Sequence, residues 1–513
     1  MFCKVVSASL YGINGLIVNV EVDVSDGLPG FDLVGLPDSA VKESKERVRT
    51  AIKNSGFSFP VKRITVNLSP ADIRKEGPAF DLPIAVGILA CLGIVKESSL
   101  KDILIVGELS LDGKINRVNG ILPIVYSAYK EGYKKCIVPK DNVLEAAVVK
   151  GIDIIGASNL EEVSRYIKGD LDIEPTNIEI DKTFSVNKEE NINDFSDIKG
   201  QQNVRRALEV AAAGMHNILM IGPPGAGKTM MAKRIPSILP DLSFEESIEI
   251  TKIYSVAGLL KKDESLIIER PFRSPHHTVS NSALTGGGRI PRPGEISLAH
   301  RGVLFLDELP EFQKNVLEVM RQPLEDGQVT ISRVNASLTY PSNFMLVASM
   351  NPCPCGYYPN TEKCQCTPPQ IQRYLHKISG PLLDRIDIHI EATSVNYDEL
   401  HENTKNESSK KIKTRVKKAQ EIQKERYNKI NSEESYFNAS LTPSNIEKFC
   451  RLGKEEKSIV KQAFQSLNLS ARAYHRILKV ARTIADLDES ESIKINHLSE
   501  AIQYRTLDRK YWD

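Results

Sequence analysis

The residues with the clearest chemistry form a glycine-rich loop after the apolar stretch 217–221: Gly222, Pro223, Pro224, Gly225, Ala226, Gly227, Lys228 and Thr229. Glycines let the backbone turn tightly and point its N–H groups at phosphate oxygens, and the following helix adds the positive end of its dipole. Lys228 would reach the β- and γ-phosphates, and the Thr229 hydroxyl would bind Mg²⁺. The spacing predicts a nucleoside triphosphate as ligand; the alternative is an ordinary glycine-rich turn.

Two carboxylates and an amide follow apolar runs further along the chain. The run 303–306 ends in Asp307 and Glu308, and the run 343–349 leads to Asn351. Transfer of a phosphoryl group to water needs one carboxylate that holds Mg²⁺ and another that orients or deprotonates the water. We assign these roles to Asp307 and Glu308. Asn351 would hold the attacking water, although an Asn-Pro pair is also a common start of a turn.

Two arginines lie where they can contact a phosphate. Arg385 follows an apolar helix end and can reach the γ-phosphate of a neighbouring subunit, or else pair locally with Asp384 or Asp387. Arg472 opens the helix predicted over 474–486. Their positions alone leave both roles open.

Four cysteines form two Cys-x-Cys pairs, Cys353 with Cys355 and Cys364 with Cys366. Four thiolates so close in sequence match a tetrahedral Zn²⁺ site, which would be structural because it leaves no open coordination position. The alternative is a redox-labile set of disulfides or free thiols. Because the pairs lie between Asn351 and Arg385, such a site would fix the loop that joins them.

The charge balance excludes a global positive field. Lys and Arg number 67, and Asp and Glu number 66, among 513 residues. Any binding to nucleic acid must therefore be local. The basic helix predicted over 410–426 is either a solvated face or a DNA-facing patch. The longest apolar run, 82–95, is too short to span a bilayer, and no N-terminal signal is evident. We expect a cytoplasmic protein without a membrane partner.

Periodicity divides the chain into four segments. Residues 1–169 alternate short strands with helices, the latter over 39–55 and 79–93, and 170–193 are a polar linker. Residues 194–392 alternate strands and helices, which indicates a parallel sheet covered by helices. Residues 393–513 are helical. The fold class is therefore α/β.

Several motifs together carry a family resemblance: 270–278, Gly286-Gly-Gly288, 293–300, the run 303–308, 351–356 and 380–387. In order and spacing they resemble the AAA+ ATPases of the magnesium-chelatase-like group, and within it the YifB/ComM branch. The resemblance covers essentially the whole chain. It implies a central AAA+ core with ATP and Mg²⁺ as cofactors, and an all-helical AAA+ lid from 393.

The same resemblance implies roles for single residues. Asn351 would be sensor 1, Arg385 the arginine finger and Arg472 sensor 2, in a homo-hexameric ring with ATP sites between subunits. Residues 197–201 would cradle adenine. Residues 255–288 would include a helix-2 insert facing the ring pore, and 327–341 a hairpin before sensor 1. Arg333, near the expected turn at Asn335, is a candidate DNA contact; an exposed cross-strand charge is the alternative. We expect His276 and His277 to be structural.

The first segment resembles the Lon protease domain, an α+β fold like domain 2 of ribosomal protein S5. Lon-like proteases use a Ser–Lys dyad. Here Ala79 takes the place of the serine and Leu122 that of the lysine. Neither side chain can perform the chemistry, so we expect an inactive domain that supports ring assembly or DNA binding.

The resulting hypothesis is an ATP-driven hexameric helicase that binds single-stranded or branched DNA and promotes branch migration of recombination intermediates, as in natural transformation. The alternative is an ATPase that remodels a protein or drives metal insertion, as magnesium chelatase does. A third reading, an ATP-dependent protease, is disfavoured by Ala79 and Leu122.

Overall fold

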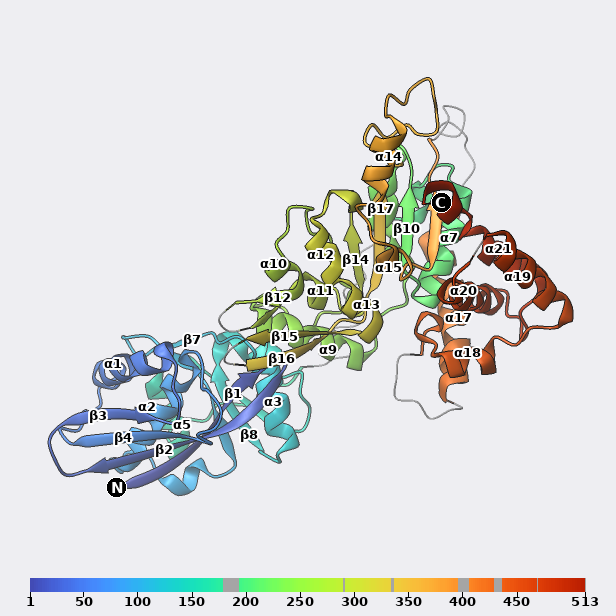
Figure 1. Cartoon of the computed structure of the whole chain (residues 1–513). Helices are drawn as coiled ribbons and strands as arrows, with labels where there is room; N and C mark the ends of the chain where they lie inside the picture. The colour runs from blue at the N-terminus through green and yellow to red at the C-terminus, as the bar shows by residue number, and fades with distance from the viewer. Residues whose placement is uncertain are drawn as a thin grey trace. The chain divides into compact units, whose positions relative to one another are not determined.

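The computed structural model describes residues 1–178, 193–288, 291–333, 336–394, 406–428, 436–467 and 469–512. Two units divide the chain (Figure 1). Unit 1 comprises Met1–Asn187 and Ser243–Ile268, and unit 2 comprises Lys188–Leu242 and Glu269–Asp513. Among the described residues, no helix combines the length and apolarity needed to cross a bilayer. Most of the expected linker, together with the turn at Asn335, lies outside the described residues.

Unit 1 is built on a mixed sheet of seven strands in the order β3-β4-β2-β1-β5-β8-β9. The strands are β1 (Phe2–Tyr11), β2 (Asn14–Ser25), β3 (Gly30–Val34), β4 (Arg63–Ser69), β5 (Ile103–Ile105), β8 (Lys135–Pro139) and β9 (Asp153–Ala157). A small hairpin pairs β6 (Glu108–Leu109) with β7 (Ile115–Asn116). Strands β1, β2 and β4 pair antiparallel, whereas β5, β8 and β9 run parallel.

The helices of unit 1 are α1 (Ser39–Asn54), α2 (Asp81–Cys91), α3 (Ile121–Lys130), α4 (Val143–Ala146), α5 (Leu160–Lys168) and α9 (Phe244–Ala257). Helix α1 begins where expected because the Asp38 side chain accepts from the backbone N–H of Val41 at 2.8 Å. Helix α2 is apolar all round and buried along its length, as a core helix must be.

Helix α9 belongs to unit 1, whereas the sequence predicted that residues 194–392 form one uninterrupted block. It packs against α3, and the Ser255 hydroxyl hydrogen-bonds Glu145. Leu266 joins the apolar cluster of Leu122 and Ile124. Of the expected pore-facing insert over 255–288, the part up to Ile268 therefore belongs to unit 1.

Unit 2 holds a five-stranded parallel sheet in the order β11-β14-β17-β10-β18. The strands are β11 (Phe272–Arg273), β14 (Val303–Leu306), β17 (Met345–Met350), β10 (Ile218–Ile221) and β18 (Ile388–Glu391). Helices α7 (Gln202–Gly214), α8 (Lys228–Ile238), α10 (Asn281–Thr285), α11 (Glu295–Leu298), α12 (Lys314–Val319), α13 (Arg321–Asp326), α14 (Pro368–Leu375) and α15 (Gly380–Leu383) surround it. Two hairpins pair β12 (Gly286–Gly287) with β13 (Arg292–Pro293), and β15 (Gln328–Arg333) with β16 (Ala336–Pro341).

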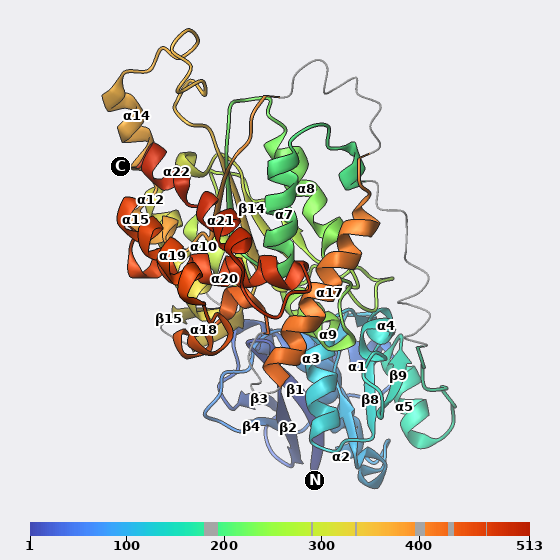
Figure 2. The ribbon, with the colours of Figure 1, turned by 90° about the vertical axis from the view of Figure 1, so that its right-hand side faces the viewer.

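The C-terminal part of unit 2 is helical. It comprises α17 (Ser409–Asn428), α18 (Pro443–Phe449), α19 (Lys454–Ser466), α20 (Ala471–Leu487), α21 (Ile495–Gln503) and α22 (Thr506–Tyr511). Figure 2 shows α17 and α20 beside α7. One apolar cluster runs from the sheet into these helices. The predicted α/β class, with parallel sheets and a mostly helical C-terminal region, is confirmed.

Candidate active site

The glycine-rich loop joins β10 to α8 at the carboxyl edge of the parallel sheet. Gly225 and Gly227 adopt φ angles of 80° and 79°, in the left-handed region that favours glycine. The Lys228 ammonium donates to the carbonyl oxygens of Gly222 and Pro223 at 2.7 and 2.9 Å. Burial lowers the pKa of Lys228. The cation thus lies inside the turn of the loop.

Asp307 follows β14 and connects the glycine-rich loop to strand β17. The Thr229 hydroxyl donates to one carboxylate oxygen of Asp307 at 2.6 Å, and the Ser349 hydroxyl donates to the other. The structure therefore places together the two residues assigned to Mg²⁺. Ser349 was not among the predicted residues. The register could have indicated it, because Leu306 pairs with Ala348, which sets Asp307 opposite Ser349.

Asn351 follows β17 and lies beside the phosphate loop. Its side-chain oxygen accepts from the Lys228 ammonium at 3.1 Å. Because β10 and β17 are parallel neighbours, with Ile221 opposite Met350, residues that follow both strands meet at one edge. The position suits a group that senses the γ-phosphate.

Glu308 occupies a left-handed backbone conformation, with φ at 53°. Its side chain is 56% exposed and lies 3.6 Å from the His277 ring nitrogen Nδ1. The His277 ring in turn lies tilted beside that of His276, with ring centroids 4.0 Å apart. Both histidines were expected to be structural, so the neighbourhood of His277 and Glu308 is a feature that the sequence did not indicate.

Arg385 lies at the opposite edge of the same sheet. It precedes β18, whereas the phosphate loop follows β10, and the two strands run parallel with Ile218 opposite Ile388. The length of the strands, at about 3.3 Å per residue, separates Arg385 from its own phosphate loop. Arg385 is 8% exposed. Its guanidinium pairs with Glu325 and donates to the Pro381 carbonyl at 2.7 Å.

Asp387, one of the two local partners expected for Arg385, pairs with other residues instead. Asp387 pairs with Arg476 of α20 and lies 3.1 Å from His216 Nδ1. Burial alone would raise the pKa of Asp387, but the charge of Arg476 and the hydrogen bond with His216 hold this pKa well below its usual range. His216 also contacts the Thr483 hydroxyl at 2.7 Å. This buried cluster ties the approach to β18 to helix α20.

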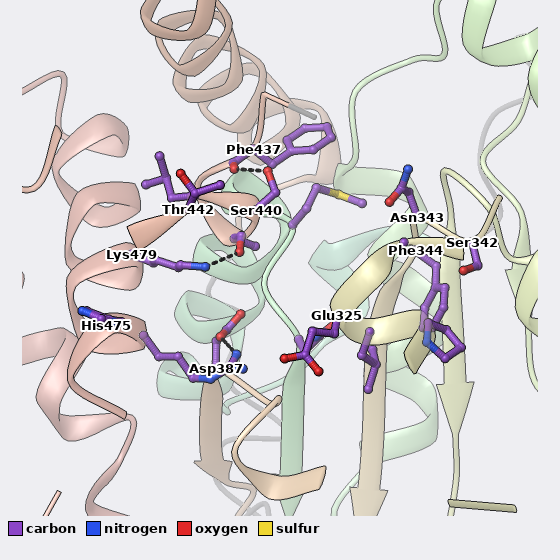
Figure 3. A pocket seen from close by; sticks show the side chains of 18 of the residues that line it. Glu325, Ser342, Asn343, Phe344, Asp387, Phe437, Ser440, Thr442, His475 and Lys479 are labelled. Atoms are coloured by element: carbon purple, nitrogen blue, oxygen red, sulfur yellow. Dashed lines mark hydrogen bonds and ion pairs between the residues drawn. The ribbon is translucent and has the colours of Figure 1, made fainter. Parts of the chain in front are cut away.

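Arg472 lies at the start of α20 and lines a cavity of about 480 Å³ at the amino edge of the sheet. Figure 3 shows this cavity, with Glu325, His475 and Lys479 among its labelled side chains. Several of the lining side chains are basic: Arg270, Arg301, Arg472, His475, Arg476 and Lys479. Glu325 reaches the same cavity. Its hydrogen bond with Arg385, aided by the charge of Arg472, lowers the pKa of Glu325. Arg472 and Arg385 thus share one side of unit 2, away from the phosphate loop.

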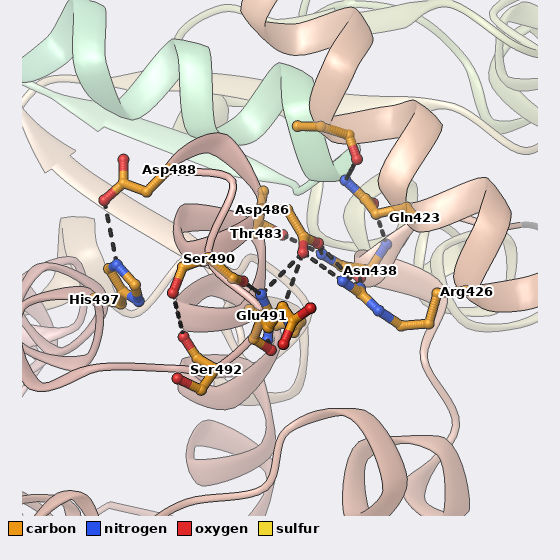
Figure 4. A network of polar contacts seen from close by, with 12 residues as sticks. Gln423, Arg426, Asn438, Thr483, Asp486, Asp488, Ser490, Glu491, Ser492 and His497 are labelled. Atoms are coloured by element: carbon orange, nitrogen blue, oxygen red, sulfur yellow. Dashed lines mark hydrogen bonds and ion pairs between the residues drawn. The ribbon is translucent and has the colours of Figure 1, made fainter.

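A buried ionic network holds α20 in place (Figure 4). Asp486, 1% exposed, accepts from Arg426 of α17 at 3.0 Å, from Arg482 at 3.1 Å and from Asn438 at 2.8 Å. Arg482 also donates to the Glu491 carbonyl at 2.8 Å. Since Arg472 and Arg476 lie on the same helix, this network fixes their position relative to the sheet.

The four clustered cysteines converge in space. The sulfur of each lies within 4.8 Å of the others. Three of the pairs are separated by 3.3 Å (Cys353 and Cys355), 3.6 Å (Cys355 and Cys364) and 3.8 Å (Cys353 and Cys364). A Zn–S bond of about 2.3 Å sets the sulfurs of a regular tetrahedron about 3.8 Å apart. The donor set therefore fits zinc.

Ala79 and Leu122 both lie in unit 1 and are buried, 8% and 0% exposed. They belong to one apolar cluster, which also contains Leu266. The positions where a Lon-like dyad would stand are thus part of the core. Nearby, the Leu122 N–H donates to the buried carboxylate of Glu145 at 3.0 Å.

The remaining predicted residues have simpler surroundings. Arg333 ends β15 and is exposed, beside its own strand's Ser332. In the expected adenine-cradling segment, Asp197 pairs with Arg234 of α8 at 2.9 Å.

Much of the positive charge on α17 is paired: Arg415 with Glu209 and Glu407, and Lys413 with Asp241. This favours the structural interpretation of that basic helix over a DNA-facing patch.

Known families match three parts of the chain. The model described as "Magnesium chelatase, subunit ChlI" matches residues 194–400, that of "Subunit ChlI of Mg-chelatase" matches 20–142, and that of the ChlI C-terminal region matches 406–505. The chain is similar to competence protein ComM of Haemophilus influenzae, 46% identical over 98% of this chain and 97% of that protein. It is also similar to YifB of Escherichia coli, 45% identical over 97% and 96%. Magnesium-chelatase subunit ChlI of Guillardia theta is 26% identical over 32% of this chain and 53% of that subunit.

Proposed function

Because the chain belongs to the magnesium chelatase ChlI family of AAA+ proteins, in the branch that includes ComM and YifB, we propose that it is an ATP-driven motor acting on DNA. Asp307 carries the ATPase part of this proposal, since its carboxylate touches Thr229 and lies one residue before Glu308. Mg²⁺ would be held by Thr229 and Asp307 and would neutralise charge on the phosphates. Glu308 would activate water, and Asn351 would hold that water in line.

The arginines support a site shared between subunits. Arg385 lies at the sheet edge opposite its own phosphate loop, on the same side as Arg472. We infer that both contact the γ-phosphate bound by a neighbouring copy, as in a hexameric ring. In a single chain, without a neighbouring copy, the Arg385 side chain pairs with Glu325. Chemistry would then require two copies of the chain.

The DNA part rests on the relatives and on one exposed hairpin. A competence protein is 46% identical over nearly the full length, and we propose helicase activity that promotes branch migration of recombination intermediates. Arg333, exposed at the end of β15, would contact DNA phosphates. Such contacts are independent of sequence and weaken with salt.

The test is hydrolysis of ATP with single-stranded, branched and double-stranded DNA at low salt. We expect DNA to stimulate turnover and salt to abolish the stimulation. Arg333→Ala should lose much of the stimulation while its DNA-free turnover is unchanged. If DNA neither binds nor accelerates hydrolysis at low salt, the motor proposal fails, although the ATPase assignment stands.

A second candidate is a protein-remodelling or metal-inserting ATPase, favoured by the match of three ChlI models along the chain. The same assay separates the two candidates. Stimulation by a partner protein without any response to DNA would support remodelling.

The cysteine cluster is proposed to hold one structural Zn²⁺ through Cys353, Cys355, Cys364 and Cys366. The backbone N–H of Tyr358 points at the Cys353 sulfur at 3.4 Å, and such donors stabilise thiolate ligands. Metal analysis of freshly reduced protein should give one zinc per chain, reduced in Cys364→Ser. Freshly reduced wild-type protein without zinc would contradict this assignment.

A further inference from the structure

The cysteine knuckle, defined as residues 351–367, has little regular structure of its own. Between the end of β17 and the start of α14 it consists of turns and bends. A few backbone hydrogen bonds support it, among them Cys364 N–H to Asn360 O at 2.8 Å and Gly356 N–H to Cys353 O at 3.0 Å. Its shape therefore depends on what joins the four sulfurs.

The knuckle is in van der Waals contact with the phosphate loop. A Cβ atom placed on Gly356 would lie 2.5 Å from Cδ of Pro224, and the Gly356 φ angle is 86°. A proline ring within the loop has little freedom to move aside. The backbone of the knuckle at Gly356 thus fits against Pro224 because residue 356 lacks a side chain.

The knuckle also returns to Asn351. The segment leaves Asn351, passes the cysteines and enters α14, where the Tyr374 oxygen accepts a hydrogen bond from the Asn351 backbone N–H. Tyr374 is buried, 6% exposed. Asn351 itself contacts Lys228. Two independent contacts, Gly356 with Pro224 and Tyr374 with Asn351, therefore connect one loop to the phosphate-binding residues.

We propose that the knuckle is a positioning element of the ATP site, and that zinc on its four thiolates sets the affinity of the phosphate loop for nucleotide. With the metal bound, Gly356 stays against Pro224 and Asn351 stays beside Lys228. Without it, both contacts loosen and the loop loses preorganisation. This inference rests on the proposed ATP and zinc sites. No residue of the knuckle other than Asn351 needs to touch the nucleotide.

The first variant tests the contact between Gly356 and Pro224 and leaves the metal ligands unchanged. Gly356→Ala retains all four cysteines, so zinc should stay at the wild-type level, while the Kd for a fluorescent ATP analogue should rise about tenfold because of the clash and the positive φ. Gly132→Ala is the matched control. Gly132 has a φ of 85°, and a Cβ there would meet nothing within 4 Å. Its nucleotide Kd should equal that of the wild type.

A second pair of variants covers the possibility that Gly356→Ala misfolds. Cys364→Ser should lose zinc and raise the Kd by a similar factor, and Tyr374→Phe should retain zinc but lower kcat because Asn351 is less well held. Zinc content, thermal unfolding and Kd are measured on each full-length protein. A wild type that binds no ATP rejects the proposed function itself. Wild-type Kd in both Gly356→Ala and Cys364→Ser, in a wild-type background that binds ATP and zinc, overturns this inference alone.

Discussion

The Asp307 carboxylate accepts hydrogen bonds from the Thr229 and Ser349 hydroxyls and from the Glu308 backbone N–H at 3.0 Å. These donors fix the orientation of the carboxylate before any metal is bound. Hydrogen bonds to an ionised acceptor are worth about 1.5–3 kcal/mol each. Loss of the Ser349 hydroxyl should therefore weaken the binding of Mg²⁺ by Asp307.

Ser349→Ala should raise the Mg²⁺ concentration required for half-maximal ATP hydrolysis by about tenfold, because one orienting hydrogen bond on Asp307 is lost. Turnover at saturating Mg²⁺ should change little. A titration of ATPase rate against Mg²⁺ measures both quantities. An unchanged Mg²⁺ dependence would mean that Ser349 only fills space.

Glu308→Gln should bind ATP with wild-type affinity and lose turnover by about 100- to 10,000-fold, since the amide retains the shape of the side chain but cannot accept the proton of water. Equilibrium binding and steady-state hydrolysis together give the result. If the variant still hydrolyses ATP at the wild-type rate, another residue is the base.

At the scale of elements, helix α20 is held by a largely buried set of charges. Asp486 neutralises Arg426 and Arg482, and Arg482 is 2% exposed. Removing one partner of such a group leaves an uncompensated buried charge. The C-terminal helical part of unit 2 is therefore more sensitive to this aspartate than to its exposed neighbours.

Asp486→Ala should lower the free energy of unfolding by about 3–5 kcal/mol. Asp488→Ala is the matched control. The Asp488 side chain is 44% exposed and 3.2 Å from His497, so its loss should cost less than about 1 kcal/mol. Denaturant unfolding of the two variants distinguishes them. Equal effects would show that burial of the network contributes nothing.

At the scale of the whole molecule, Arg385 and Lys228 are predicted to serve different ATP sites of one ring. Arg385→Ala and Lys228→Ala should each be inactive alone. Mixing them should restore part of the hydrolysis, because some interfaces combine an intact loop with an intact arginine. Each variant mixed with itself is the control. Absence of rescue at every mixing ratio would contradict a shared site.

Much of the site follows from sequence because its parts follow strands. Asp307 and Asn351 come directly after apolar runs, and Lys228 ends the loop that follows a third; parallel strands bring such positions to one edge. Ser349 and Glu325 could not be predicted in this way. The partner of Ser349 depends on the register between β14 and β17, and that of Glu325 depends on the packing of α13. The membership of α9 in unit 1 was also not predicted. Leu266 and Ser255 acquire their contacts only through tertiary packing.

The insertion of 243–268 into unit 1 has a consequence for biosynthesis. Chains emerge from the ribosome N-terminus first, and domains generally fold as units in that order. Unit 1 lacks α9 and Leu266 until Ile268 has been synthesised. By then the phosphate loop, residues 222–229, has already been made. Unit 1 therefore cannot finish folding until the phosphate loop of unit 2 has been made, and a nascent chain halted before Ser243 would expose the apolar surface that α9 covers.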